Sequence, residues 1–170
     1  QMLRNDKQVS QSIIGVTSPR NVEFVKSLGC CDQIVLYQNE AQIDPLLPTA
    51  YIDMSGDARL TINLHNHVGE NIVESCMVGA SHWQEGGKVG DLPGARPRFF
   101  FAPGQIEKRN KEWGPGVAMA RAMAASAEVA ERVAADINIE WVYGADSLAD
   151  HWARLLDNQI APSQGLMVVL

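Results

Sequence analysis

Short apolar segments alternate with amphipathic helical segments along nearly the whole chain. This alternation is typical of parallel sheets, because a chain that joins two parallel strands must cross over, most often through a helix. Strands are expected at 12–16, 33–37, 50–54, 71–78, 98–102, 139–143 and 165–170, and helices at 21–27, 57–68, from 104 onward, at 115–135 and at 146–158. The sequence therefore predicts an α/β fold with a parallel, doubly wound sheet and flanking helices.

The composition is that of a water-soluble globular protein, with 46% hydrophobic and 20% charged residues. A length of 170 residues suits one domain over 1–170, with the last segment as a C-terminal tail. The net charge of −6 disfavours nucleic acid and anionic membranes as partners. The three cysteines do not make a disulfide framework, so a cytoplasmic location is expected.

A glycine-rich phosphate loop of the pattern Gly-x-Gly-x-x-Gly does not occur in this chain. The chain begins with Gln1, and its first residues resemble the end of a helix rather than a start. We therefore expect a Rossmann-like sheet that lacks its first strand and glycine loop, as in a piece of a longer protein. The open edges of such a sheet favour a homo-oligomer.

The turn after the first predicted strand carries Ser18, Arg20 and Asn21 and no carboxylate. At the corresponding turn of dinucleotide-binding sheets, an acidic residue binds the free ribose of NAD(H), whereas arginine accommodates the 2′-phosphate of NADP(H). The planar guanidinium of arginine suits a phosphate dianion. The pattern predicts that Thr17, Ser18, Arg20 and Asn21 bind NADP(H). The alternative is an ordinary strand-to-helix connection, with Asn21 as the helix N-cap and Arg20 in solvent.

Ser55 and Gly56 follow the strand expected at 50–54. Ligands of open parallel sheets bind beyond the carboxyl ends of the strands, and a glycine there allows a ribose or pyrophosphate to approach the backbone. Ser55 and Gly56 are therefore candidate cofactor-binding residues. A plain turn capped by Ser55 or Asp57 explains the same residues without a ligand.

The segment after the next strand is Gly79, Ala80, Ser81 and His82. The first three are small, which would let a nicotinamide ring approach the backbone, and they are predicted to bind the cofactor. His82 is the candidate catalytic residue, as a proton donor or a group that orients the substrate. A solvated loop histidine is the alternative.

The histidines and cysteines do not have the spacing of a metal site. His65 and His67 lie two apart on a predicted helix and point to different faces. Cys30 and Cys31 are adjacent and lack the Cys-x-x-Cys spacing of zinc sites. No bound metal is therefore expected.

The run of three phenylalanines at 99–101 is expected to be a strand in the hydrophobic core.

Three strings of residues resemble an uncharacterised bacterial and fungal family of unknown function that is related to the medium-chain dehydrogenases and reductases. They are TSPRNVEFV at 17–25, VGASHW at 78–83 and FFFAPGQIEKR at 99–109. The resemblance implies a zinc-free, NADP-linked protein similar to the quinone oxidoreductases of that superfamily. It also implies an N-terminal catalytic domain of distorted-barrel type that this chain does not contain.

Two hypotheses about function follow. In the first, the protein is an NADP(H)-dependent oxidoreductase that moves hydride between nicotinamide and a carbonyl or activated alkene of a small-molecule substrate. In the second, it is a non-catalytic nucleotide-binding or assembly module that retains the fold, because fold alone does not fix function.

Overall fold

The computed structural model describes residues 10–79 and 90–170. Within them the chain is an α/β protein whose parallel strands form small sheets. It divides into two compact units, one from Val35 to Ala120 and one that joins the chain before Val35 to Arg121–Leu170.

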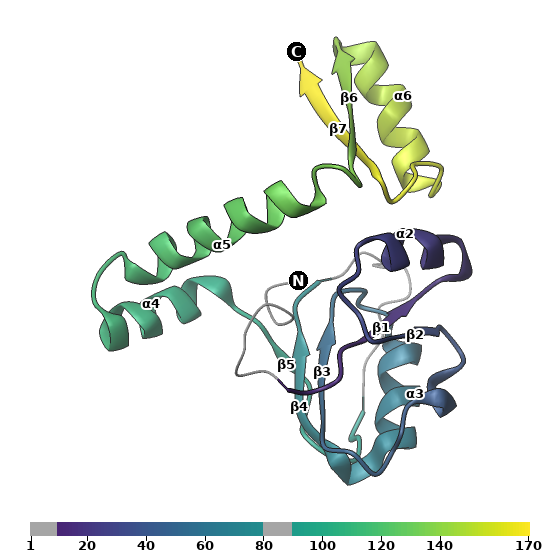
Figure 1. Ribbon diagram of the computed structural model, residues 1–170, viewed down its shortest axis with the longest axis vertical. Helices are drawn as coiled ribbons and strands as arrows, with labels where there is room; N and C mark the ends of the chain where they lie inside the picture. The colour runs from purple at the N-terminus through teal and green to yellow at the C-terminus, as the bar shows by residue number, and fades with distance from the viewer. Residues whose placement is uncertain (1–9, 80–89) are drawn as a thin grey trace. The chain divides into compact units, whose positions relative to one another are not determined.

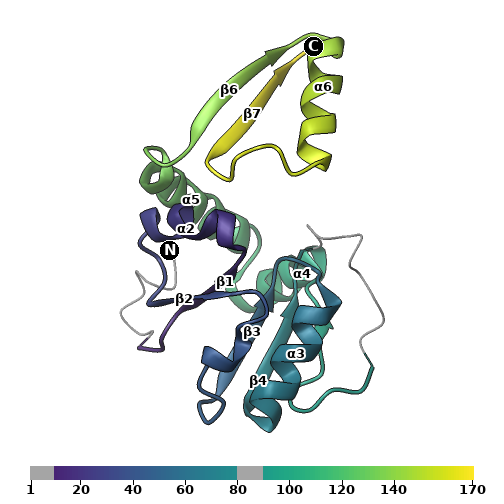
Figure 2. The same cartoon turned by 90° about the vertical axis from the view of Figure 1, so that its right-hand side faces the viewer.

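The unit Val35–Ala120 contains a three-stranded parallel sheet (Figure 1). Its strands are β3 (Thr49–Asp53), β4 (Ile72–Met77) and the short β5 (Arg98–Phe99), in the order β3-β4-β5. Helix α3 (Ala58–Val68) connects β3 to β4 and lies along one face of these strands (Figure 2). The β3-α3-β4 segment is thus the strand-helix-strand crossover that the alternating pattern predicts.

Helix α3 packs on the sheet through an apolar stripe. Leu60, Leu64 and Val68 are spaced by four residues and are at most 5% exposed. Residues with this spacing lie on one face of a helix, which explains why that face is buried. Gly69 ends the helix with φ of +65°, a conformation that glycine adopts without strain.

A second glycine of this unit is required by a close approach between strand ends. The backbone nitrogens of Val78 and Gly79 both donate to the carbonyl oxygen of Asp53, at 2.8 and 3.1 Å. A Cβ at Gly79 would lie 2.3 Å from the carbonyl oxygen of Met54, far inside normal contact. Gly79 therefore lets the chain leaving β4 pack against the end of β3.

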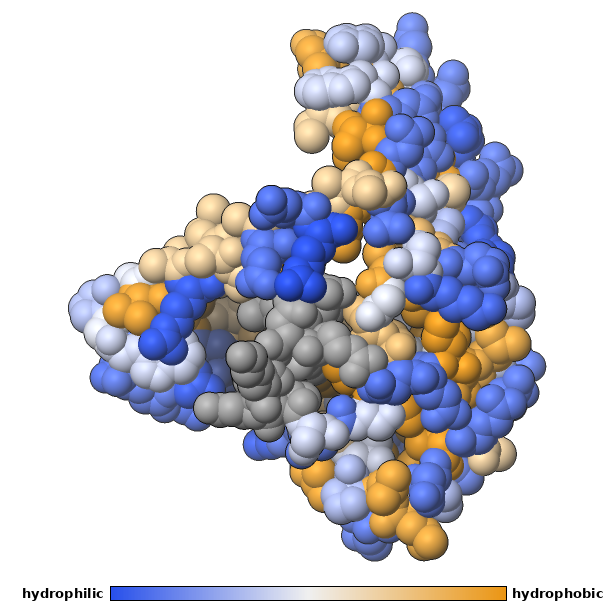
Figure 3. All heavy atoms as spheres, viewed as in Figure 1, coloured by the Kyte–Doolittle hydropathy of each residue, from blue (hydrophilic) through white to orange (hydrophobic). Residues whose placement is uncertain are grey.

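The other unit contains a two-stranded parallel sheet of β6 (Asn138–Tyr143) and β7 (Gln164–Val169). Helix α6 (Ala145–Leu156) connects the two strands and lies beside them (Figure 1). Val142 of β6 is 1% exposed, whereas Trp141 and Tyr143 are 56% and 65% exposed. Met167, Val168 and Val169 of β7 are 46%, 39% and 40% exposed, so side chains of both strands reach the surface. Figure 3 shows hydrophobic and pale residues at the surface in this part of the molecule.

The strands β1 (Ile14–Thr17) and β2 (Gln33–Leu36) form the remaining sheet. Between them lie a short 3-10 helix, η1 (Pro19–Asn21), and helix α2 (Val22–Ser27). The Asp32 carboxylate accepts a hydrogen bond of 2.8 Å from the Ile13 nitrogen, just before β1.

The remaining elements lie between the strands along the chain. They are η2 (Glu40–Gln42), η3 (Gly69–Asn71), α4 (Ala102–Trp113) and α5 (Val117–Val133). Among them, η3 belongs to the crossover from β3 to β4. None of the described helices is long and apolar enough to cross a membrane.

The predicted strands and helices are confirmed in kind and nearly in their bounds, with one exception. The expected core strand at 98–102 is wrong: β5 pairs with β4 only at Arg98 and Phe99, and α4 has already begun at Ala102. The side chains of Phe99, Phe100 and Phe101 are 69%, 40% and 61% exposed. The reason is that the chain leaves the sheet at Phe99, with a proline in the first turn of the helix that follows.

The described strands pair as β1–β2, β3–β4–β5 and β6–β7. The parallel α/β character is therefore established. A single doubly wound sheet stays a prediction.

The Gly79→Ala substitution tests the close approach between β3 and β4. The added methyl group must displace the backbone at Met54, and overpacking of this kind lowers the free energy of unfolding by about 1–3 kcal/mol. Urea unfolding of the variant measures the loss. Gly90→Ala is the matched control, because a Cβ there meets no atom of the described residues within 4 Å. Equal stability of the two variants would contradict the assigned role of Gly79.

Candidate functional site

The carboxyl ends of β3, β4 and β5 meet at one edge of their sheet. Asp53 is in register with Met77, and Met77 is in register with Phe99. In open parallel sheets this is the edge at which ligands bind. The turn after β3 and the chain after β4, which contains Gly79, both lie there, as the sequence predicts.

The side chain of Asp53 organises the turn after β3. It is only 3% exposed, and its Oδ1 accepts hydrogen bonds from the Ser55 nitrogen and hydroxyl, both at 2.8 Å, and from the Gly56 nitrogen at 2.9 Å. Its other oxygen, Oδ2, is 3.4 Å from the Thr61 hydroxyl of α3. The nitrogens of Ser55 and Gly56 and the Ser55 hydroxyl therefore all donate to Asp53. These hydrogen bonds fix the conformation of the turn.

Asp57 caps helix α3. Its Oδ1 accepts hydrogen bonds from the nitrogens of Arg59 and Leu60, at 2.9 and 3.1 Å, and its own nitrogen donates to the Ser55 hydroxyl at 3.2 Å. A carboxylate at this position also interacts favourably with the helix dipole. The first turn of α3 is thus occupied by the protein's own anion, which disfavours a phosphate there.

Two tyrosines accompany these carboxylates. Burial raises the pKa of Tyr51, whose hydroxyl is 3.4 Å from that of Thr61. Burial also raises the pKa of Tyr37, and the negative charges of Asp57 and Asp53 raise it further. Both phenols therefore stay protonated at neutral pH, and neither is tuned as a proton donor for that range.

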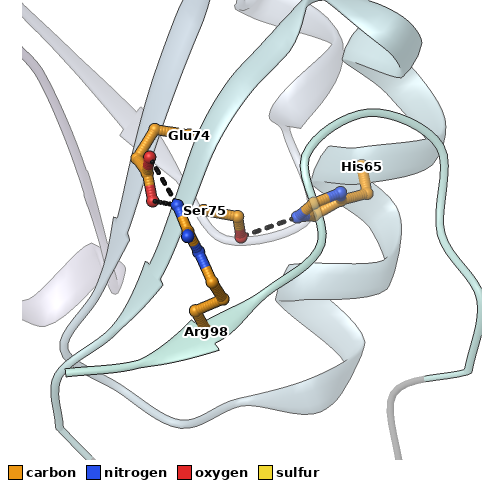
Figure 4. A network of polar contacts seen from close by, with 4 residues as sticks. All are labelled: His65, Glu74, Ser75 and Arg98. Atoms are coloured by element: carbon orange, nitrogen blue, oxygen red, sulfur yellow. Dashed lines mark hydrogen bonds and ion pairs between the residues drawn. The ribbon is translucent and has the colours of Figure 1, made fainter. Parts of the chain in front are cut away.

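A buried histidine ties α3 to the sheet behind this edge (Figure 4). His65 is 0% exposed; its Nδ1 lies 2.9 Å from the Pro93 carbonyl oxygen and its Nε2 lies 2.9 Å from the Ser75 hydroxyl. Since a carbonyl only accepts, Nδ1 donates to Pro93, while the Ser75 hydroxyl is able to donate to Nε2 or accept from it. Ser75 is 1% exposed, so this serine–histidine pair is structural and is closed to a substrate.

His67, two residues on, contacts a different part of the chain. Its Nε2 lies 2.8 Å from the Ile43 carbonyl oxygen. The two histidines thus bind separate partners, in agreement with their predicted placement on different faces. No group of three or more histidine, cysteine or acidic side chains suited to a metal is found in the ranges 10–79 and 90–170.

The predicted cofactor turn after β1 has a structural partner in its own unit. The Arg20 guanidinium donates to the carbonyl oxygens of Asn158 and Ile160, the second at 2.7 Å, in the segment that follows α6. Arg20 is therefore not simply solvated, as the alternative interpretation held. Binding of a 2′-phosphate by Arg20 stays a prediction.

The other residues of this turn are Thr17, Ser18 and Asn21. Thr17 is 8% exposed at the end of β1, and Ser18 precedes η1. Asn21 occupies the N-cap position of α2, as the alternative predicts, but its side chain makes no cap hydrogen bond. The Oδ1 atom of Asn21 is buried and has no hydrogen-bond partner among the described residues, although helix α2 begins at the next residue.

The structure thus brings together the predicted residues in two groups. Thr17, Ser18, Arg20 and Asn21 lie at the end of β1, and Ser55, Gly56 and Gly79 lie at the edge formed by β3 and β4. The remaining candidates, Ala80, Ser81 and His82, lie outside the described residues.

Sequence reasoning missed the polar groups that face inward. Asp53 shares a strand face with Tyr51, and Thr61 and His65 share a helix face, so these positions follow the period of the core. A polar residue at a core position is a signal of a buried hydrogen-bond network. The sequence does not show, however, which residue each of these polar side chains bonds to.

The Asp53→Ala substitution tests the network at the end of β3. It leaves the donors of Ser55 and Gly56 without their acceptor in a buried turn, so we expect the free energy of unfolding to fall by about 3 kcal/mol or more. Asp44→Ala is the control, because the Asp44 carboxylate makes a similar bond to the Leu46 nitrogen on the exposed surface. We expect a loss of about 0.5 kcal/mol or less there. Similar losses in chemical denaturation would refute the central role of Asp53.

The comparisons with known proteins give one result. No curated protein and no solved structure matches the chain. A family profile matches residues 1–161, which is most of the chain. The chain belongs to the family described as Protein of unknown function (DUF2855).

Proposed function

We propose that this chain is the nucleotide-binding part of a zinc-independent, NADP(H)-linked oxidoreductase-like protein of the medium-chain reductase type. The observation that carries the proposal is the order of the strands. Doubly wound dinucleotide-binding sheets have the order 3-2-1-4-5-6. Without strand 1, that order leaves a pair, 3-2, and a triplet, 4-5-6. The described strands pair as β1–β2 and as β3-β4-β5, which matches this pair and this triplet in chain order.

In this assignment β1 takes the place of strand 2, and the turn after it is the one that binds the adenosine ribose. This turn offers Ser18, Arg20 and Asn21 and no carboxylate, which favours the 2′-phosphate of NADP(H). Two of the five N–H donors of Arg20 contact backbone carbonyls, so donors remain for a phosphate. Those contacts also hold the guanidinium in place, and a pre-positioned group loses less entropy on binding.

The edge after β3 and β4 would serve the rest of the cofactor. Gly79 brings two strand ends into backbone contact, and such a surface admits a flat ring or a sugar. When bound, the cofactor supplies the hydride chemistry, and this chain binds and orients it. A small molecule with a carbonyl or activated alkene is the proposed substrate, with His82 as the proposed proton donor and the cytoplasm as the proposed compartment.

A non-catalytic nucleotide-binding or assembly module is the second candidate. The hydrogen bonding at the end of β3 favours it, because Ser55, Gly56 and Asp57 bond mainly to groups of the same turn. A site that is satisfied internally offers few groups to a substrate. In both candidate functions the chain binds a nucleotide, but only in the first does the protein convert a substrate.

Fluorescence titration with NADPH and NADH tests the proposal. We expect saturable binding, with NADPH bound at least about tenfold tighter, the scale of one charge-assisted phosphate contact. Arg20→Ala should remove the preference, and Arg20→Lys should restore it only in part, because lysine lacks the planar fork.

Arg132→Ala is the control, since Arg132 is an exposed arginine in the last turn of α5, outside both proposed cofactor-binding segments. Thermal unfolding of each variant separates lost binding from lost folding, because Arg20 also contacts two carbonyls. Equal affinity for both cofactors would overturn the assignment of NADP(H). Binding of neither would overturn the nucleotide-binding proposal itself.

A further inference from the structure

His151 of α6 has both ring nitrogens directed at hydrogen-bond acceptors. Its Nδ1 lies 2.8 Å from the Ser147 carbonyl oxygen, and its Nε2 lies 3.1 Å from the Glu140 carboxylate of β6. A carbonyl and a carboxylate can only accept, so both bonds exist together only when both nitrogens carry protons. The geometry therefore calls for the positively charged imidazolium.

The same carboxylate also contacts the second strand. The Gln164 side-chain nitrogen of β7 donates to the other oxygen of Glu140. One carboxylate thus joins α6, β6 and β7. The histidine side chain is 15% exposed and that of Glu140 is 38% exposed, so water screens the pair only in part.

Helix α6 is only partly buried against its sheet. No side chain of α6 is fully buried over Ala145–Leu156, a range that the structure describes throughout. The sheet beneath it has only two strands, and small sheets depend strongly on packing against another element. A single ion pair at the contact between α6 and β6 therefore has a large share in fixing the helix.

We propose that His151 is a proton-operated clasp, which fastens α6 to the β6–β7 sheet when its ring is charged and releases the helix when the ring is neutral. The inference does not depend on the proposed nucleotide. The charged groups that face the ring are Glu140 from β6, which favours the charged form, and Arg154 from α6 itself, which opposes it. Gln164, from β7, is neutral.

The direction of the pH dependence follows from these contacts. The bond to the Ser147 carbonyl, and then the bond to Glu140, raise the pKa of His151 above its ordinary value of 6.5. A group whose pKa is raised on folding binds its proton more tightly in the folded state. The clasp therefore contributes fully below pH 6.5, and its contribution is lost as the pH rises through the raised pKa of the folded state.

Two measurements on the whole chain test the clasp. In a histidine NMR titration, we expect His151 to lose its proton above pH 6.5, and Glu140→Gln to shift that titration downward. In hydrogen–deuterium exchange, peptides that cover α6 should be better protected in the wild type than in His151→Gln at pH 6. That ratio should fall by roughly threefold by pH 8.5, the scale of one partly exposed ion pair.

The wild type and the variant are compared at the same pH, so the intrinsic pH dependence of hydrogen exchange cancels. His67→Gln is the control variant, because His67 is a histidine that bonds to the Ile43 carbonyl, outside the contact of His151. A His151 titration at or below 6.5 would overturn the proposal, as would a protection ratio that does not change with pH. Loss of the pH dependence in the His67→Gln variant would overturn it as well, because the switch would then lie elsewhere.

Discussion

The buried carboxylate of Asp53 is the interaction on which the β3-α3-β4 part of the structure depends. Its side chain accepts hydrogen bonds from Ser55 and Gly56, while its backbone carbonyl accepts from Val78 and Gly79. The end of β3, the turn into α3 and the chain leaving β4 are therefore fixed through one residue. A buried acceptor with this many donors is costly to remove, because each donor would lose its partner away from water.

The β6-α6-β7 part is held together differently. Its sheet has two strands, and Ile139, Trp141 and Tyr143 on one face of β6 remain substantially exposed. Parallel strands are ordinarily covered on both faces, so little apolar burial secures α6 here. This explains why a charged contact between Glu140 and His151 matters at all. If a large apolar contact secured the helix, an exposed ion pair of this kind would contribute little to its stability by comparison.

Several residues that suit a nucleotide also have a role in the fold. Arg20 contacts the chain after α6, and Gly79 allows the close approach of two strand ends. A loss of binding on substitution at either position is thus informative only beside a measurement of stability. The family profile covers most of the chain but carries no activity, so the proposed function rests on strand order and on the residues of the turn after β1.

The sequence by itself determined the succession of strands and helices, because the periods of apolar residues are local properties of the chain. It also placed polar residues after β1 and β3 and separated His65 from His67. Only the tertiary structure decided where β5 ends, that Phe99–Phe101 are exposed, and that Arg20 meets carbonyls about 140 residues away. The tertiary structure alone also decided that His65 pairs with Ser75 and His151 with Glu140. Such contacts join side chains from different elements, and no local pattern records which elements will pack together.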